Sequence, residues 1–390
     1  MALTQVAVCH TALHESREAG MHLAMSVSEQ LGGARPDVII VFASPSYSFP
    51  QLIDALHEHA RPRILVGCSS AGEFSGCLSA NSSASVMAIR SDDILFNAGV
   101  GTGLRENREN SAQQLFPVFT ADQHKDHPYR FALVLTDALA GYADDLIHSI
   151  TLHTKGTYQL FGGGAADDAQ FQKTHVFFGR EQFADSAVVL EMLSKKPIGL
   201  GLKHGWEPLG APLRVTEAEE NRLISMNATS AADIFEEHAT LTGQIFNRAD
   251  PLPFFLHNVI GIDTGDGYKL RVPLSLEADG SISCASEIPV GSTVYIMTGN
   301  TDTACDAARH AAQTAIDKLQ GAKHAGSLMF DCAATRLRLG RAFGNELSAV
   351  ATVLGSENFA GCNTYGQIVR AEGQFSGFHN CTAVVLAIPE

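Results

Sequence analysis

The sequence contains no uninterrupted apolar run of about 18 residues, the length that a helix needs to cross a bilayer. Its opening stretch, MALTQVAVCHTALHES, also lacks the basic region and the long apolar core of a secretion signal. These two absences predict a protein with no membrane attachment that works in the cytoplasm.

Basic residues are scarce. The chain carries 27 lysines and arginines against 42 acidic residues, which gives a net charge of −15. A nucleic-acid-binding protein needs a clustered basic face, and the arginines at 336, 338 and 341 are too few to form one. We therefore expect no nucleic-acid partner.

The cysteine pattern excludes several kinds of site. The chain has eight cysteines, and none of them forms a CxxC pair, so neither a zinc ribbon nor a thioredoxin-like site is indicated. A disulfide framework is not expected in so long a chain without a secretion signal. Most of the thiols are predicted to be buried as small apolar groups.

One structural unit recurs along the chain. An apolar strand, an amphipathic helix, a second strand and a glycine-rich turn follow one another within residues 37–90, again within 131–193 and again within 326–388. Alternating strands and helices favour an α/β fold, and repetition favours internal duplication. The predicted fold is therefore α/β, with two packed lobes built from repeated βαβ-like units that have glycine-rich turns after strands.

The region between the second and third copies has a different pattern. It contains an amphipathic helix at 229–241, hairpin-like strands within 257–299 and an alanine-rich helix at 302–319, which Asp302 could cap. The change of pattern places the domain boundary near residue 220. The predicted domains are residues 1–220 and 221–390.

Six segments, in this order along the chain, resemble the sensory proteins of the FIST family. Those that resemble the FIST N-terminal domain are GCSSAGEFSG (67–76), GGGAADDAQFQKTHVF (162–177) and PIGLGLKHGWEPLG (197–210), and those that resemble the FIST C-terminal domain are GSLMFDCAATRLRLG (326–340), GCNTYGQI (361–368) and GFHNCTAVVLAI (377–388). The resemblance implies a ligand-sensing module of signal transduction. It also implies a stand-alone sensor that acts through a separate partner, commonly a histidine kinase.

The sequence departs from the family pattern in its last glycine-rich turn. Asn363 and Gln367 stand where the family often has an aromatic residue and a glutamate. Carboxylate chemistry is therefore in doubt at this turn, whereas amide hydrogen bonding is not.

The glycine-rich turns at 67–74 and 361–368 are the predicted ligand site, because they follow strands at the end where α/β sheets bind ligands. Glycine lets the backbone approach a ligand, and successive N–H groups can hold an anion. Glu73 could receive an ammonium group and Arg336 a carboxylate, which suits an amino-acid-like metabolite. The alternative is a structural Glu73–Arg336 pair. The candidate ligand-binding residues are Cys68, Ser69, Ser70, Glu73, Gly163, Gly164, Trp206, Cys332, Arg336, Asn363, Thr364, Tyr365 and Gln367.

The segment KHGWEP is similar to that of stand-alone family members that bind haem and sense nitric oxide. The resemblance implies haem b, with His204 as the first candidate for the iron ligand and His379 as the second. A neutral imidazole beside Trp206 in an apolar pocket would suit that role. The alternative is a half-buried His204 bonded to the backbone. No CxxCH motif is present, so that motif would not attach the haem covalently.

Two further chemistries are weighed against simpler roles. Cys68 could serve a thiol-dependent hydrolase, and Cys332 is a second possible nucleophile, but buried, inert thiols are the favoured interpretation. The adjacent Asp167 and Asp168 could hold a hard cation, but a turn explains them more simply. We therefore predict no enzymatic activity.

Overall fold

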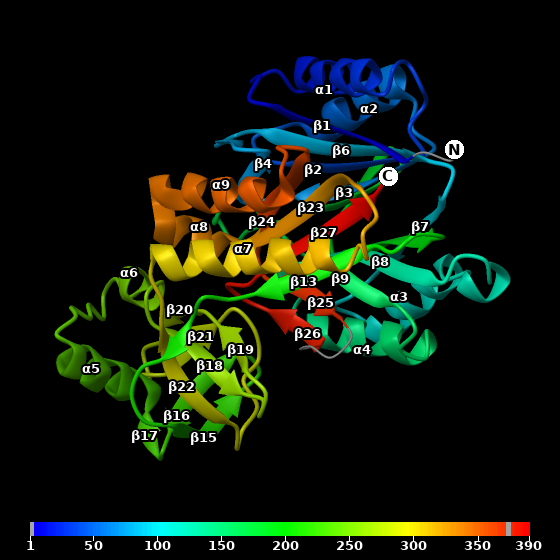
Figure 1. Ribbon diagram of the computed structural model, residues 1–390. Helices are drawn as coiled ribbons and strands as arrows, with labels where there is room; N and C mark the ends of the chain where they lie inside the picture. The colour runs from blue at the N-terminus through cyan, green and yellow to red at the C-terminus, as the bar shows by residue number, and fades with distance from the viewer. Residues whose placement is uncertain (1–3, 372–375) are drawn as a thin grey trace.

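The computed structural model describes residues 4–371 and 376–390 and consists of two bodies (Figure 1). A large core body holds the repeated units, and residues 204–300 form a smaller inserted body. The predicted α/β class and the repeated βαβ-like units with glycine-rich turns are confirmed. The division of the chain at residue 220 stays a prediction.

Each of the three units of the core body runs strand, helix, strand, helix, strand, hairpin, strand, so each contains an opening strand and helix beyond the predicted repeat. The first unit comprises β1 (Thr4–Thr11), α1 (Ser16–Gln30), β2 (Val38–Ala43), α2 (Phe49–Ala60), β3 (Ile64–Ser69), β4 (Glu73–Ser75), β5 (Leu78–Ala80) and β6 (Ala84–Ser91). The second comprises β7 (Ile94–Thr102), α3 (Arg108–Leu115), β8 (Tyr129–Asp137), α4 (Ala143–His153), β9 (Gln159–Ala165), β10 (Val176–Phe178), β11 (Glu181–Phe183) and β12 (Ser186–Ser194). The third comprises β13 (Gly199–Lys203), α7 (Thr301–Asp317), β23 (His324–Cys332), α8 (Ala333–Leu339), α9 (Phe343–Leu354), β24 (Phe359–Thr364), β25 (Gln367–Arg370), β26 (Ser376–His379) and β27 (Ala383–Pro389).

The units exchange their hairpins. Each unit forms a sheet in the order first, last, second and third strand, and the hairpin at the far edge comes from another unit. The hairpin β4–β5 joins the sheet of the third unit, β10–β11 joins that of the first, and β25–β26 joins that of the second. The exchange ties the three units into a closed cycle and brings their glycine-rich turns together.

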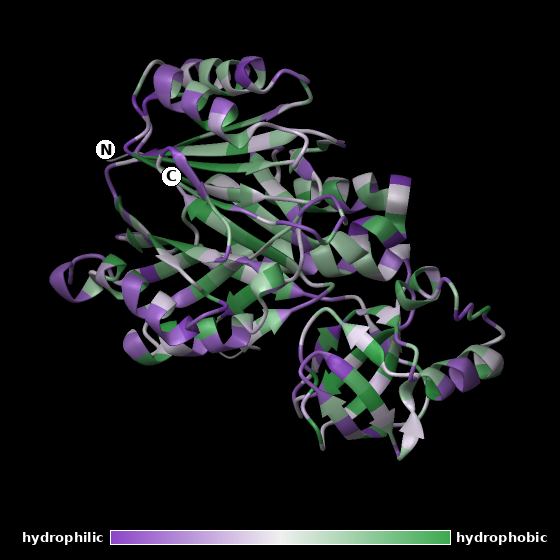
Figure 2. Cartoon of the chain, turned by 180° about the vertical axis from the view of Figure 1, so that it is seen from behind, coloured by the Kyte–Doolittle hydropathy of each residue, from purple (hydrophilic) through white to green (hydrophobic). Residues whose placement is uncertain are grey.

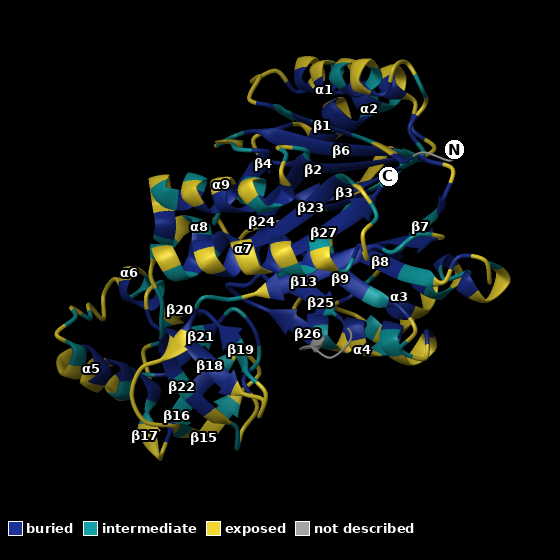
Figure 3. Cartoon of the chain, in the orientation of Figure 1, coloured by how far each residue is buried: buried dark blue, intermediate teal, exposed yellow. Residues whose placement is uncertain are grey.

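The three sheets enclose one shared apolar core. Phe330 of β23 packs against Phe42 of β2 and Phe161 of β9, with ring centroids 5.5 and 6.3 Å away respectively. Helix pairs α1/α2, α3/α4 and α7/α9 cover the outer faces, so the strands are buried on both sides. Figure 2 shows mostly hydrophobic strands beneath helices with hydrophilic outer faces, and Figure 3 shows the matching pattern of burial.

Helix α7 packs unusually close to its sheet because small residues meet there. A Cβ atom added to Gly199 or Gly201 of β13 would lie 1.8 or 2.0 Å from a carbonyl oxygen of α7. The alanine-rich sequence of α7 is therefore a packing requirement. The N-cap is Asn300, whose side chain accepts from the Thr303 N–H in a capping box, so the predicted cap at Asp302 is wrong.

The inserted body is a nine-stranded antiparallel assembly with two helices. Its elements are β14 (Glu207–Pro208), β15 (Leu213–Glu219), β16 (Arg222–Met226), β17 (Thr229–Ser230), α5 (Ala231–Thr242), α6 (Leu252–Phe255), β18 (Val259–Asp263), β19 (Tyr268–Arg271), β20 (Pro273–Leu276), β21 (Ile282–Cys284) and β22 (Thr293–Thr298). It has its own core, which includes Phe235, Phe254 and Phe255. Among the described residues, no helix is both long and apolar enough to cross a membrane.

Candidate ligand site

The three glycine-rich turns meet at one place, which we call the turn junction (residues 69–73, 163–168 and 363–367). Backbone hydrogen bonds join the turns pairwise: Ala71 N–H to Asn363 O (2.9 Å), Tyr365 N–H to Gly164 O (3.0 Å) and Ala166 N–H to Ser69 O (2.9 Å). The junction lies at the carboxyl ends of β3, β9 and β24, where the sequence predicted a site.

Most of the predicted ligand residues are buried in this junction and hold it together. Gln367 donates from Nε2 to Thr364 Oγ1 (2.9 Å) and accepts at Oε1 from the Thr382 N–H (3.2 Å). Ser69 Oγ accepts from the His175 N–H at 3.0 Å. Trp206, Cys332 and Tyr365 are also buried. The other buried members of the predicted set are Cys68, Ser69, Ser70, Glu73, Gly163, Gly164, Asn363, Thr364 and Gln367. These buried residues hold the backbone of the turn junction in place.

Glu73 is 0% exposed, and its carboxylate is fully occupied by serines. Ser70 Oγ donates to Oε1 and Ser83 Oγ donates to Oε2, both at 2.6 Å. Burial raises the pKa of the Glu73 carboxyl to about 7, against the lowering effect of the two serine hydroxyls. Glu73 therefore does not face the space that a ligand would fill.

Arg336 does face such a space. Its guanidinium donates to uncharged acceptors, namely Ala80 O (3.1 Å), Asn81 Oδ1 (2.9 Å) and Asn363 Oδ1 (3.3 Å). In the described part of the chain no ion pair neutralises it directly, so the structural Glu73–Arg336 pair is not formed. A guanidinium in this state can take a carboxylate in a two-pronged bond.

The cavity beside Arg336, which we call the Arg336 cavity, has a volume of about 670 Å³. Arg336, Arg341 and Asp168 are its charged lining residues, so positive charge predominates. Asp168 accepts a hydrogen bond from Ser44 Oγ at 2.6 Å. The position of Arg336 depends on Gly72, whose φ is +134° and where an added Cβ would lie 2.5 Å from the guanidinium carbon. No larger residue leaves Arg336 in place.

The loop that carries Asp168 has an unusual backbone. Asp168, Ala169 and Phe171 have φ values of 54°, 61° and 52°, a region that non-glycine residues occupy at a cost of roughly 1–2 kcal/mol each. Asp167 holds the loop, because its carboxylate accepts from the Tyr365 hydroxyl and from the N–H groups of residues 171–173 at 2.7–2.8 Å. These donors occupy the Asp167 oxygens that a cation would need. Strain of this kind is concentrated at functional sites.

His204 and His379, which are distant in the sequence, line one further cavity of about 660 Å³ together with Trp206. His204 Nδ1 accepts from the Trp206 N–H (3.3 Å), and Nε2 faces Tyr268 O at 3.2 Å, so Nε2 carries the proton and donates. Burial lowers the pKa of His204 to about 4, and the ring is neutral. In this arrangement His204 offers no nitrogen lone pair to iron, so it does not fit the role of haem ligand. Burial also lowers the pKa of His379.

The two candidate nucleophiles are both buried, and Cys332 also lines a cavity between the two bodies. Cys68 is 0% exposed and lies in the shared core, against Cys362 of β24. Cys332 is 3% exposed at the end of β23, where hydrogen bonding from the Cys381 thiol lowers its pKa. Cys68 is therefore closed to the substrate of a hydrolase.

The sequence did not predict that Arg341 and Asp168 line the Arg336 cavity. It also did not predict the hydrogen bond that the Ser83 hydroxyl donates to Glu73. Asp168 was visible only as half of an aspartate pair, and nothing in the sequence places it opposite Arg336. Ser83 lies ten residues from Glu73, beyond the hairpin β4–β5. Ser83 meets Glu73 through this local hairpin, whereas Asp168 meets Arg336 only because different units come together.

Comparison with protein families gives two adjoining matches. Residues 37–229 match the FIST N domain, and residues 231–370 match the FIST C domain. The chain is also 21% identical over 307 residues to an uncharacterized protein of Methanocaldococcus jannaschii, MJ1623, a match that covers 74% of this chain and 59% of that protein. The matched region thus spans less than two thirds of this relative.

Solved structures of low similarity also align with the chain. A cyanuric acid hydrolase has 11% sequence identity and a TM-score of 0.35, with 99% of each chain covered. Thermotoga maritima PurL complexed with ATP has 10% identity and a TM-score of 0.24, covering 99% of this chain and 71% of that one. Superposition at this level says nothing about the chemistry of this chain.

Proposed function

Because the chain belongs to the FIST family, whose domains are small-ligand sensors of signal transduction, we propose that it senses an amino-acid-like metabolite in the Arg336 cavity. The carboxylate of the ligand would bind Arg336, and its ammonium group would face Asp168. The observation that carries this proposal is the Arg336 guanidinium, which forms no ion pair with any residue that the structure describes and lies at the wall of a 670 Å³ cavity.

The charges of the cavity support a zwitterionic ligand. Arg336 and Arg341 supply positive charge, and Asp168 supplies one carboxylate among the lining residues. Asp168 replaces Glu73 in the role that the sequence suggested for an ammonium partner, since Glu73 is buried behind its serines. Asn81 and Ser79 add uncharged hydrogen-bonding groups to the same wall.

A thermal-shift screen with amino acids tests the proposal. We expect at least one amino acid to raise the unfolding temperature of the wild type, because a ligand that binds only the folded state stabilises it. Arg336→Lys should weaken this response strongly, since a single ammonium cannot form the two-pronged bond. A folded wild-type protein that responds to no amino acid would overturn the proposal.

We also keep haem-based nitric oxide sensing as a separate proposal. Its support is the cavity that two histidines and Trp206 line together, and the bonds of His204 argue against that residue as the ligand. Adding haemin to the purified protein and recording the Soret band before and after nitric oxide tests it. A sharp band that survives in His204→Ala and disappears in His379→Ala would assign the iron to His379. Broad, nonspecific absorbance would reject haem.

We further propose that the output goes to a separate signalling protein such as a histidine kinase. What supports this is membership of a sensory family together with a core and an inserted body that a ligand could rearrange. Co-purification with candidate kinases, with and without ligand, tests the proposal. Binding that is the same in both states would argue against a ligand-controlled contact.

A further inference from the structure

A second cavity, which we call the interbody cavity, adjoins the Arg336 cavity. Its volume is about 380 Å³, and it shares Ala169, Ala333 and Leu337 with the Arg336 cavity as lining residues. Two of these shared residues lie on α8, and the third lies in the strained loop after Asp168. The two cavities therefore adjoin each other along α8 and the loop after Asp168.

The interbody cavity is apolar and belongs to both bodies. Side chains from the core body include Leu139, Phe171 and Phe378, and those from the inserted body include Leu252, Leu256 and Leu274. Phe171 stacks on Tyr365 with ring centroids 4.5 Å apart, which fixes one face of the cavity. The volume lies within the range of small-molecule pockets, roughly 300–1,000 Å³.

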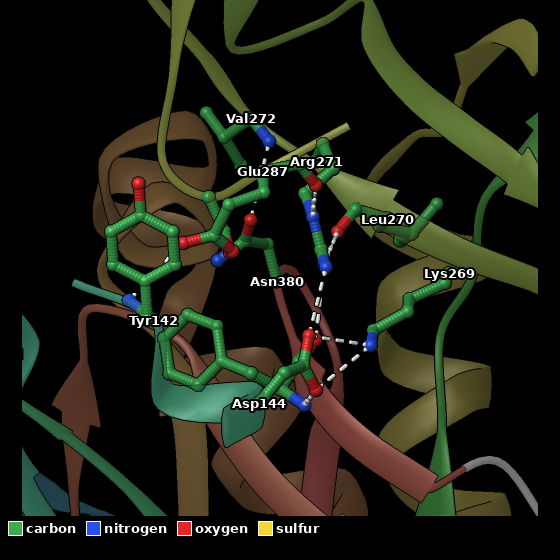
Figure 4. Close-up of polar contacts among 10 residues, drawn as sticks. Tyr142, Asp144, Lys269, Leu270, Arg271, Val272, Glu287 and Asn380 are labelled. Carbon is green, nitrogen blue, oxygen red and sulfur yellow. Dashed lines mark hydrogen bonds and ion pairs between the residues drawn. The ribbon is translucent and has the colours of Figure 1, made fainter. Parts of the chain in front are cut away.

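Two polar lining residues of the interbody cavity, Glu287 and Asn380, are already bonded to the protein, and Glu220 is a further charged lining residue. Glu287 accepts from the Tyr142 N–H (3.1 Å) and from the Ser286 hydroxyl (2.5 Å). Asn380 Oδ1 accepts from the Val272 N–H at 3.4 Å. Figure 4 shows Glu287, which accepts from the Tyr142 N–H, and Asn380, which accepts from the Val272 N–H, at the boundary of the two bodies. The cavity thus presents mainly apolar surface to a guest.

From these two compartments we infer that the ligand is a carboxylate with a sizeable apolar side chain, which passes over Leu337 into the interbody cavity while its head group stays on Arg336. The inference rests on the proposed function and narrows its ligand class. Small zwitterions such as glycine would fill only the polar compartment. Aliphatic and aromatic amino acids would fill both.

This arrangement also assigns a route for the signal. The apolar part of the ligand would contact leucines of α6 and β20 in the inserted body as well as residues of α8 in the core body. Binding would therefore favour one orientation of the inserted body, because a ligand shifts an equilibrium by its differential affinity for the two states.

Calorimetric titration with glycine, L-alanine, L-leucine and L-phenylalanine tests the inference. Each buried methylene contributes about fourfold in affinity, so leucine should bind at least about tenfold more tightly than glycine. Leu256→Ala, at a residue that lines the interbody cavity and not the Arg336 cavity, should reduce that advantage and leave glycine binding unchanged. Leu152→Ala is the matched control, because Leu152 is an exposed leucine on α4 that lines neither cavity.

The outcomes separate this inference from the proposed function. If glycine and leucine bind with equal affinity and Arg336→Lys weakens both, the inferred role of the interbody cavity is wrong, while the proposed amino-acid sensing stands. No binding of any of the four compounds would overturn the inference, and a response to other amino acids in the thermal-shift screen would still leave the proposed function standing. Ala285→Leu, which adds bulk to the interbody cavity, should lower leucine affinity and spare glycine.

Discussion

Glu73 and Gln367 occupy equivalent positions in two of the exchanged hairpins. Glu73 of β4 pairs with Cys362 of β24, and Gln367 of β25 pairs with Gly163 of β9. One unit therefore places a carboxyl where another places an amide. Because the Glu73 carboxyl is buried with a pKa of about 7, it too is neutral in mildly acidic solution.

The raised pKa of Glu73 makes stability depend on pH. Between its ordinary pKa of 4.5 and about 7, the folded protein keeps a proton that the unfolded chain has released. The stability contributed by the protonated carboxyl is thus complete below pH 4.5 and is lost as pH rises toward 7. Glu73→Gln, which cannot ionise, should gain up to about 3 kcal/mol relative to the wild type between pH 4.5 and 8.

Urea unfolding of both proteins at several pH values measures this difference. Glu109→Gln, an exposed glutamate on α3, is the matched control and should follow the wild-type profile. Parallel profiles for Glu73→Gln and the wild type would show that the carboxyl ionises at an ordinary pH in the folded state.

At the scale of elements, the strained loop depends on a contact from another unit. The Tyr365 hydroxyl donates to Asp167, which in turn accepts from the N–H groups of residues 171–173. Tyr365→Phe leaves a buried carboxylate with one donor fewer, and we expect a loss of about 1–3 kcal/mol in unfolding free energy. Hydrogen exchange of the 171–173 amides should accelerate.

Tyr129→Phe is the control for this change, since no described residue bonds the Tyr129 hydroxyl. Unchanged exchange rates in Tyr365→Phe would mean that the loop keeps its conformation without the contact between units.

The repeated elements themselves could be predicted from the sequence, because apolar strands and amphipathic helices such as 49–60 carry a local periodic signal. The opening strands β1, β7 and β13 were not assigned to the repeat, since only pairing with the last strand of each unit defines their role. The Asp302 cap was wrong by two residues, which is within the usual uncertainty of a helix start.

The site was predictable only in part. Arg336 and the glycine-rich turns were found because guanidinium and glycine have distinctive chemistry. That Ser83 bonds Glu73 follows from the local fold of the hairpin β4–β5, and that Asp168 lies at the Arg336 cavity follows from the meeting of different units. Contacts between units leave no periodic trace in the sequence.

At the scale of the whole molecule, a cluster of ion pairs joins the inserted body to the core body. Asp144 at the start of α4 accepts from Lys269 Nζ (2.8 Å) and from Arg271 Nη2 (3.4 Å), both on β19 (Figure 4). The Arg271 side chain is only 3% exposed. Asp144→Asn leaves this guanidinium without its nearest counter-charge, and we expect a loss of about 2 kcal/mol, moderated by the partial exposure of Asp144.

Chemical unfolding and limited proteolysis of residues 204–300 measure the effect of Asp144→Asn. Asp279→Asn breaks the exposed pair with Arg222 inside the inserted body and should cost less than about 1 kcal/mol. Equal, small effects of the two substitutions would mean that apolar contacts alone fix the inserted body.

The central claim is that the Arg336 guanidinium holds the carboxylate of an amino-acid-like ligand. The most direct measurement is the dissociation constant of the best-binding amino acid for Arg336→Gln, beside Arg180→Gln, which removes an exposed arginine paired with Asp54. Loss of a charge-assisted bond pair should weaken binding about 10- to 100-fold in Arg336→Gln and leave Arg180→Gln like the wild type. A dissociation constant that is the same in all three folded proteins would contradict the account.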